Sequence, residues 1–187
     1  MTEINDPIAK LASADAAEQA AAAAWLYVQG CALGDAATHA WRAHTEFAAL
    51  LTGAPTVGVA VPPETFEAIR KAHGMPRLAE VPPDQDASEF ELHIQLENGV
   101  VQLDILTTRA PGGGGAIAKF LGKFSKGIQQ VEYFVSDVER ATEILRMRFG
   151  VQPLYPQTRA GADGTRVNFF LCSTPEGRKV LIELVQQ

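Results

Sequence analysis

Two stretches of this sequence repeat the same order of predicted elements, and this repeat constrains the fold more than any single motif does. Each stretch predicts a buried strand, a helix that ends at a glycine, a short strand and then a hairpin. The two terminating glycines are Gly74 and Gly150. We therefore expect two βαβββ modules, at residues 54–108 and 127–187. Together they predict an α+β fold in which a curved mixed sheet surrounds a cleft.

Turn residues and apolar runs place the boundaries within and between the modules. Asn98-Gly99 lies between two alternating apolar runs and indicates a tight hairpin with these two residues at its centre. The short strands are expected near residues 78–81 and 154–155. Residues 109–126 contain four consecutive glycines and predict a flexible linker followed by a short helix.

The first 53 residues lie outside the repeat and predict a helical extension. Their alanine-rich composition favours helix. Gly34 fits a helix end and Asp35 the N-cap of the next helix, so two helices are expected. In the second module, Ser136 and Glu139 form the pattern of a capping box at the start of a helix.

Charge and cysteine content exclude several classes of protein. The net charge is −6 and the basic residues are scattered, which argues against a nucleic-acid or acidic-membrane partner. Cys31 and Cys172 are the only cysteines, too few for a disulfide framework. The acidic start of the chain does not look like a signal peptide, and no stretch is apolar enough to span a membrane. We expect a cytoplasmic protein whose ligand is a small molecule.

Several segments resemble the methylmalonyl-CoA epimerases of the vicinal-oxygen-chelate superfamily. The matching segments are AIAKFL at residues 116–121, GIQQV at 127–131, GADG with RVNF between 161 and 169, and VLIEL at 180–184. The resemblance implies an isomerase or epimerase that acts on a small carbonyl or acyl compound, acyl-CoA included, through an enolate-type intermediate. It also implies a homodimer.

The resemblance further implies four positions for binding metal or substrate, two in each module. They are Thr56, Asp104, Gln130 and Glu183, and two of them differ from the family pattern because Thr56 and Gln130 replace histidines. The expected ligands of a divalent metal are thus Asp104, Gln130 and Glu183. Gln130, Asp104 and Thr56 are the expected contacts to substrate, with no other cofactor.

Residues that share a sheet face with these positions complete the predicted cavity. Counting back from an Asn98-Gly99 turn places His93 opposite Asp104, and the period of two places Glu132 on the face of Gln130. Glu183, His93 and Glu132 are therefore the candidates for moving a proton, since burial among like charges raises a carboxyl pKa toward neutrality.

Two other readings stay open at this point. Some proteins of the superfamily lack metal and sequester small molecules, and the replaced histidines agree with such a binding protein. A regulatory or scaffolding protein that dimerises through its helices is the third reading, and a filled cleft would favour it. Fold-level likeness alone does not decide among them.

Overall fold

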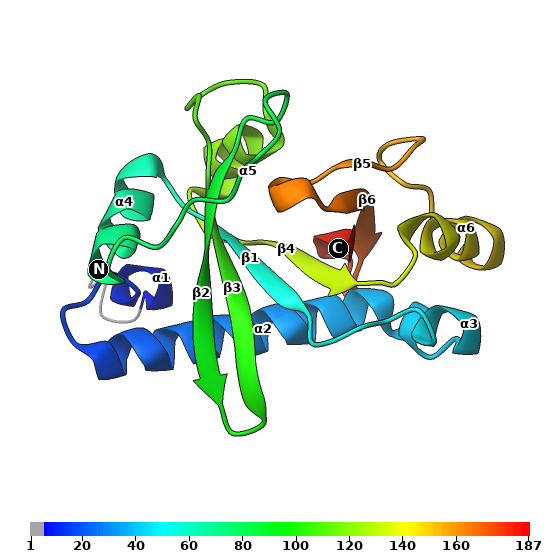
Figure 1. Cartoon of the computed structure of the whole chain (residues 1–187), viewed down its shortest axis with the longest axis horizontal. Coiled ribbons are helices and arrows are strands. Elements are labelled where there is room, and N and C mark those ends of the chain that lie inside the picture. Colours follow the sequence, from blue (N-terminus) through cyan, green and yellow to red (C-terminus); the bar gives the residue numbers. More distant parts are fainter. Residues whose placement is uncertain (1–5) are drawn as a thin grey trace.

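The computed structural model describes residues 6–187, and its centre is one seven-stranded mixed sheet in the order β2-β3-β1-β4-β7-β6-β5 (Figure 1). The predicted α+β class with a curved mixed sheet is confirmed, and the sheet is open. The strands are β1 (Thr56–Ala60), β2 (Ser88–Leu96), β3 (Gly99–Thr107), β4 (Gly127–Phe134), β5 (Arg159–Ala160), β6 (Arg166–Ser173) and β7 (Lys179–Gln186). The helices are α1 (Pro7–Lys10), α2 (Ala16–Arg42), α3 (Thr45–Ala48), α4 (Pro63–Ala72), α5 (Ala116–Phe124) and α6 (Val138–Phe149), with a short 3-10 turn η1 (Ala162–Gly164).

The two modules meet at the centre of the sheet, where β1 and β4 pair antiparallel. Gly58 lies opposite Gln130 across this junction. Within each module the central strand also pairs in parallel with one hairpin strand, so that Gly58 lies beside Asp104 and Glu132 beside Glu183. The register therefore makes Gly58 the counterpart of Glu132, and Asp104 the counterpart of Glu183.

One face of the sheet is covered by α2, which is a single helix of 27 residues rather than the two helices that we expected. Figure 1 shows it lying across the strands of both modules. Gly34 does not end this helix. A Cβ at Gly34 would lie 2.7 Å from the Tyr133 hydroxyl and 2.9 Å from a Val131 methyl, and one at Gly30 would overlap the Val57 side chain. These glycines let the helix axis approach the sheet closely, so packing overrides their poor helix propensity.

Three local predictions are wrong. Helix α6 is capped by Asp137, whose side chain accepts a hydrogen bond from the Arg140 N–H, and Ser136 is not its cap. No strand forms at residues 78–81 or 154–155, and the short strand of the second module is β5 instead. The first hairpin pairs Leu96 with Gly99, so its two turn residues are Glu97 and Asn98.

Two expectations concern the surroundings of the chain, namely its relation to membranes and its partner chain. No helix in the described range of residues 6–187 combines the length and the apolar character that crossing a bilayer requires. The expected homodimer involves a second chain and stays a prediction.

Candidate functional site

The face of the sheet opposite α2 forms a cleft of about 940 Å³. Because side chains alternate along a strand, Val57 and Val131 face α2 while their neighbours Thr56, Gln130 and Glu132 line the cleft. The cleft is therefore built from alternate positions of the central strands of both modules.

Loops from the two modules join across the mouth of this cleft. Arg77 forms an ion pair with Asp163, whose carboxylate also accepts the backbone N–H of Glu80. Arg159 pairs with Asp84 and lies over the Tyr155 ring. These contacts hold residues 77–86 of the first module against residues 155–163 of the second.

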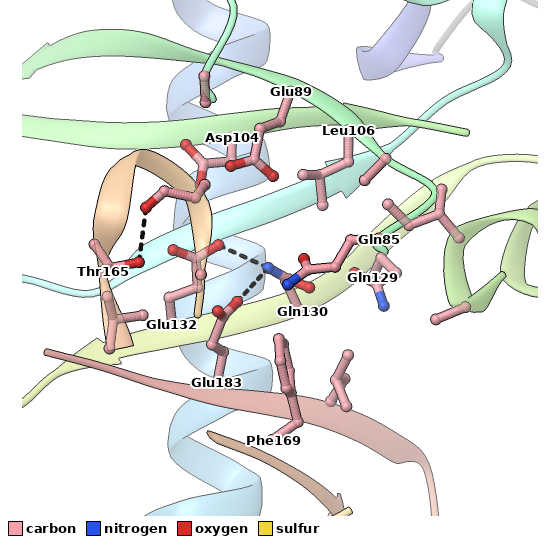
Figure 2. A pocket seen from close by; sticks show the side chains of 18 of the residues that line it. Gln85, Glu89, Asp104, Leu106, Gln129, Gln130, Glu132, Thr165, Phe169 and Glu183 are labelled. Atoms are coloured by element: carbon pink, nitrogen blue, oxygen red, sulfur yellow. Dashed lines mark hydrogen bonds between the residues drawn. The ribbon is translucent and has the colours of Figure 1, made fainter. Parts of the chain in front are cut away.

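Four carboxyl side chains, Glu89, Asp104, Glu132 and Glu183, gather at the floor and are called the carboxyl cluster below (Figure 2). Glu89 and Asp104 come from the hairpin of the first module, and Glu132 and Glu183 come from β4 and β7. Asp104, Glu132 and Glu183 are each exposed by less than a tenth. Burying several carboxyls together is costly unless protons or hydrogen bonds neutralise them.

Gln130 links two members of the cluster. Its side-chain nitrogen donates to Glu132 Oε1 at 2.8 Å and to Glu183 Oε2 at 2.7 Å, as the dashed lines in Figure 2 show. Both acceptors are carboxylate oxygens, so the amide must turn its N–H groups toward them. Gln130 thus fixes the orientation of two carboxyls.

Burial shifts the protonation of the whole cluster. Desolvation, followed by the charges of Glu132 and Glu89, raises the pKa values of Asp104 and Glu183 well above those of ordinary carboxyls. Desolvation also raises the pKa of Glu132, although hydrogen bonds from Gln130 and Asp104 oppose the rise. For Glu89, desolvation and then the Glu132 charge raise the pKa to about 7. Burial and mutual repulsion therefore favour the protonated forms of these carboxyls.

Asp104 and Glu132 influence each other directly. A hydrogen bond between the two carboxyls is among the causes that raise the pKa of Asp104, and it opposes the rise in the pKa of Glu132. The second oxygen of Asp104, Oδ1, is buried and has no hydrogen-bond partner among the described residues. Such an oxygen is costly, and it is available to a ligand that reaches the floor.

The structure separates the predicted site residues into two groups. Asp104, Gln130, Glu132 and Glu183 come together at the floor. Thr56 lines the cleft as well, but its hydroxyl donates to the Gln102 side chain at 3.3 Å.

The predicted pairing of His93 with Asp104 is wrong. His93 pairs with Gln102, and Glu91 lies opposite Asp104, because the turn lies one residue earlier than we expected. Moving the turn by one residue shifts the register by two, so His93 keeps its face but moves outward along the hairpin. Its side chain is 62% exposed and does not line the cleft.

Glu89 is the member of the cluster that the sequence analysis missed. It lies two residues before Glu91 on β2 and therefore shares its face. Following the alternation from His93 back through Glu91 to the start of the strand would have identified it.

The donor set does not fit the divalent metal that we expected at Asp104, Gln130 and Glu183. A metal needs several lone pairs that converge on one point, but Gln130 turns N–H groups into the floor and the Thr56 hydroxyl is turned toward Gln102. Across residues 6–187, no three or more His, Cys, Asp or Glu side chains form a group that could hold a metal ion. The chemistry proposed below therefore uses only groups of this chain.

Comparisons with solved structures identify relatives of the chain. No protein-family model and no curated protein matches it. It is similar to methylmalonyl-CoA epimerase from Mycobacterium tuberculosis, at 32% identity and a TM-score of 0.54 over 73% of this chain and 89% of that one. A Streptomyces coelicolor methylmalonyl-CoA epimerase variant in complex with 2-nitronate-propionyl-CoA is 27% identical, with a TM-score of 0.57 over 73% and 98%. A methylmalonyl-CoA epimerase in complex with methylmalonyl-CoA and NH4+ is 28% identical, with a TM-score of 0.56 over 73% and 95%. The identity to the mycobacterial enzyme and the seven-stranded two-module sheet show that this chain belongs to the methylmalonyl-CoA epimerase family of the vicinal-oxygen-chelate superfamily.

Proposed function

We propose that the chain is an epimerase-type enzyme that moves the α-proton of an acyl thioester, of the acyl-CoA class, through an enolate-type intermediate. The carboxyl cluster is the observation that carries this proposal. Epimerisation needs one group to remove a proton and another to return it on the opposite face. The cleft has carboxyl groups on both walls, and their raised pKa values allow one of them to accept a proton while another donates one. This arrangement meets that need.

Glu89 is the proposed general base. With a pKa of about 7 it is partly ionised at neutral pH, and it is basic enough to accept a proton from carbon adjacent to a thioester. A base of this kind works best when its pKa lies near the pH at which the enzyme operates. An ordinary glutamate with a pKa near 4.5 would be a much weaker base.

Asp104 and Glu183 would supply the protons. Both are held protonated by burial and by neighbouring negative charge, and a protonated carboxyl donates a strong hydrogen bond to a developing enolate oxygen. Glu183, on the wall opposite Glu89, is the proposed acid that reprotonates the α-carbon, while Gln130 and Glu132 hold its orientation.

Deuterium exchange tests the proposal directly. Racemic methylmalonyl-CoA, butyryl-CoA and 2-methylbutyryl-CoA are incubated with the protein in D2O, and α-deuteration is followed by mass spectrometry. We expect exchange with at least one thioester, and a loss of at least about 100-fold in Glu89→Gln, the scale of general acid–base catalysis. Glu67→Gln, which removes an exposed carboxylate on α4, is the matched control and should keep the wild-type rate.

The same experiment separates the enzyme from a binding protein. If the thioesters bind, if none exchanges its α-proton, and if Glu183→Gln binds them as tightly as the wild type does, the protein sequesters ligands and the proposal fails. A filled cleft would have favoured a scaffolding role, but the cleft of about 940 Å³ is not filled by side chains of residues 6–187.

A further inference from the structure

One wall of the cleft is apolar and belongs to the second module. Leu154 and Tyr155 line this wall although their side chains are 52% and 40% exposed, and Phe169 and Leu181 line it with them. These four residues are called the apolar strip below. Contiguous apolar surface that stays exposed inside a concave site is typical of a surface that a ligand covers.

Backbone and ring contacts hold the apolar strip in place. The Leu154 N–H donates to the Phe169 carbonyl oxygen at 2.7 Å, which ties residue 154 to β6. The Tyr155 ring meets the Phe169 ring edge-on, with the centroids 6.0 Å apart, and the Arg159 guanidinium lies over the Tyr155 ring at 4.5 Å. A ligand therefore meets a surface that is already ordered, which lowers the entropy cost of binding.

The apolar strip begins beside the proposed acid. Phe169 lies directly opposite Glu183 in the β6–β7 pair, and Leu181 lies beside Gln130 in the β4–β7 pair. Opposed side chains share a sheet face with Cβ atoms about 4.5–5.5 Å apart, and Figure 2 shows Phe169 and Glu183 on the same side of the sheet. An acyl group whose α-carbon lies at Glu183 would therefore place its next carbons against the Phe169 ring.

The two walls of the cleft differ in polarity. The first module contributes Glu89, Glu91 and Asp104 to the lining, whereas the apolar strip carries no ionisable carboxyl or amine. Arg159, which lies over Tyr155, is paired with Asp84. The cleft thus offers hydrogen bonds to one side of a ligand and apolar contact to the other.

We propose that the apolar strip binds the substituent of the acyl group, and that the substrate is a thioester with an alkyl or aryl-alkyl acyl chain. A chain that starts at Phe169 reaches Tyr155, 6.0 Å away, after about five carbon–carbon bonds of about 1.5 Å each. Acyl chains of about six to eight carbons therefore cover the strip, and shorter ones leave part of it in water. The inference rests on the proposed function for the thioester and for the place of the α-carbon.

Four CoA thioesters test this preference by calorimetric titration of the wild-type protein. Butyryl-CoA, hexanoyl-CoA and octanoyl-CoA differ only in apolar length, and 4-methoxybutyryl-CoA has the length of hexanoyl-CoA with an ether oxygen in place of one methylene. Each methylene that is buried should lower the Kd about fourfold. The Kd of hexanoyl-CoA should thus be at least about tenfold lower than that of butyryl-CoA, and lower than that of 4-methoxybutyryl-CoA by a similar factor. Equal affinities across the series, or tighter binding of 4-methoxybutyryl-CoA, would overturn the inference.

Variants assign the preference to the apolar strip. Leu154→Ala and Phe169→Ala should each reduce the ratio of the butyryl-CoA and hexanoyl-CoA Kd values at least about threefold. Leu171→Ala is the matched control, because Leu171 is 51% exposed on β6 but lies outside the lining of the cleft, and it should leave the ratio unchanged. Two variants are used so that a folding defect in one, detected by circular dichroism, still leaves a result. A ratio that stays at the wild-type value in the folded variants would place the preference elsewhere and overturn the assignment.

Failure of the proposed function can be told apart from failure of the apolar site. If hexanoyl-CoA binds with the expected preference but exchanges no α-proton, the proposed proton transfer fails and the apolar site stands. If no CoA ester binds, the acyl-CoA function fails, and hexanamide and propanamide are then titrated while the ring resonances of Tyr155 and Phe169 are followed by NMR. A larger shift with hexanamide than with propanamide supports the inference without CoA, whereas equal or absent shifts overturn it.

Discussion

Replacing Glu89 by glutamine should stabilise the protein at high pH while it removes activity. Glu89 has a pKa of about 7 in the folded protein against an ordinary value of 4.5. The folded state therefore holds this proton more tightly than the unfolded chain, and the free energy of unfolding falls as the pH rises from 4.5 through 7. That difference corresponds to roughly 3 kcal/mol of stability lost at pH 8 from this one group.

Glutamine keeps the shape of the side chain and does not ionise, so Glu89→Gln avoids that loss. We compare the free energies of unfolding of the variant and the wild type at each pH. The difference should favour the variant by about 2–3 kcal/mol more at pH 8 than at pH 5. The measurement is urea unfolding of both proteins at pH 5 and pH 8, followed by circular dichroism. Comparing the differences at the two pH values removes effects of the substitution that do not depend on ionisation.

Two results would refute this reasoning. A difference that is the same at pH 5 and pH 8 would mean that Glu89 titrates as an ordinary carboxyl. A variant that is less stable at pH 8 than at pH 5, relative to the wild type, would mean that the Glu89 carboxylate has a favourable partner. Glu67→Gln, whose carboxylate is exposed on α4, serves as the control and should change the free energy of unfolding by no more than a few tenths of a kcal/mol.

Three other predictions follow from the packing and from the donor set. Gly30→Ala places a methyl group against Val57 and should lower stability by about 1–3 kcal/mol in urea unfolding, whereas Gly122→Ala, in open space on α5, should raise it by about 0.5–1 kcal/mol. If both alanines have the same effect, the close helix–sheet approach is not what requires Gly30. Gln130→Leu removes both hydrogen bonds to the cluster and should cost about 1–3 kcal/mol while raising the pKa of Glu183 further, measured by urea unfolding and by carboxyl chemical shifts. Dialysis against EDTA should leave the Tm unchanged, and elemental analysis should find no stoichiometric divalent metal. A fall in Tm that added metal reverses would contradict the conclusion that the donor set at the floor does not fit a divalent metal.

Periodicity predicted the sheet well because the alternation of strands survives small errors of register. The hairpin turn was expected at Asn98-Gly99 and lies at Glu97-Asn98, which moved the partner of Asp104 from His93 to Glu91. Since this error changes the register by two residues, the side chains kept their face, and the expected clustering of Asp104, Gln130, Glu132 and Glu183 appears in the cleft.

Features that depend on contacts between distant segments could not be predicted in this way. Gly34 has the local properties of a helix end, and only the nearness of Val131 and Tyr133 explains why α2 continues through it. The raised pKa of Glu89 is equally nonlocal, because the charges of Glu132 on β4 and of Asp163 in the second module contribute to it. A sequence pattern shows which face a residue takes, but it does not show what covers that face.

The chemistry of the floor follows from one place where the two modules differ. Gly58 in β1 is the counterpart of Glu132 in β4. A Cβ at Gly58 would lie 2.5 Å from Gln130 Cγ, so the missing side chain gives the Gln130 chain the room to lie over β1. The counterpart position supplies Glu132, one of the two carboxyls that the Gln130 amide binds. A side chain at Gly58 would displace the donor, and a glycine at position 132 would remove an acceptor. The asymmetry between the modules is therefore what turns a duplicated sheet into a floor of hydrogen-bonded, proton-holding carboxyls.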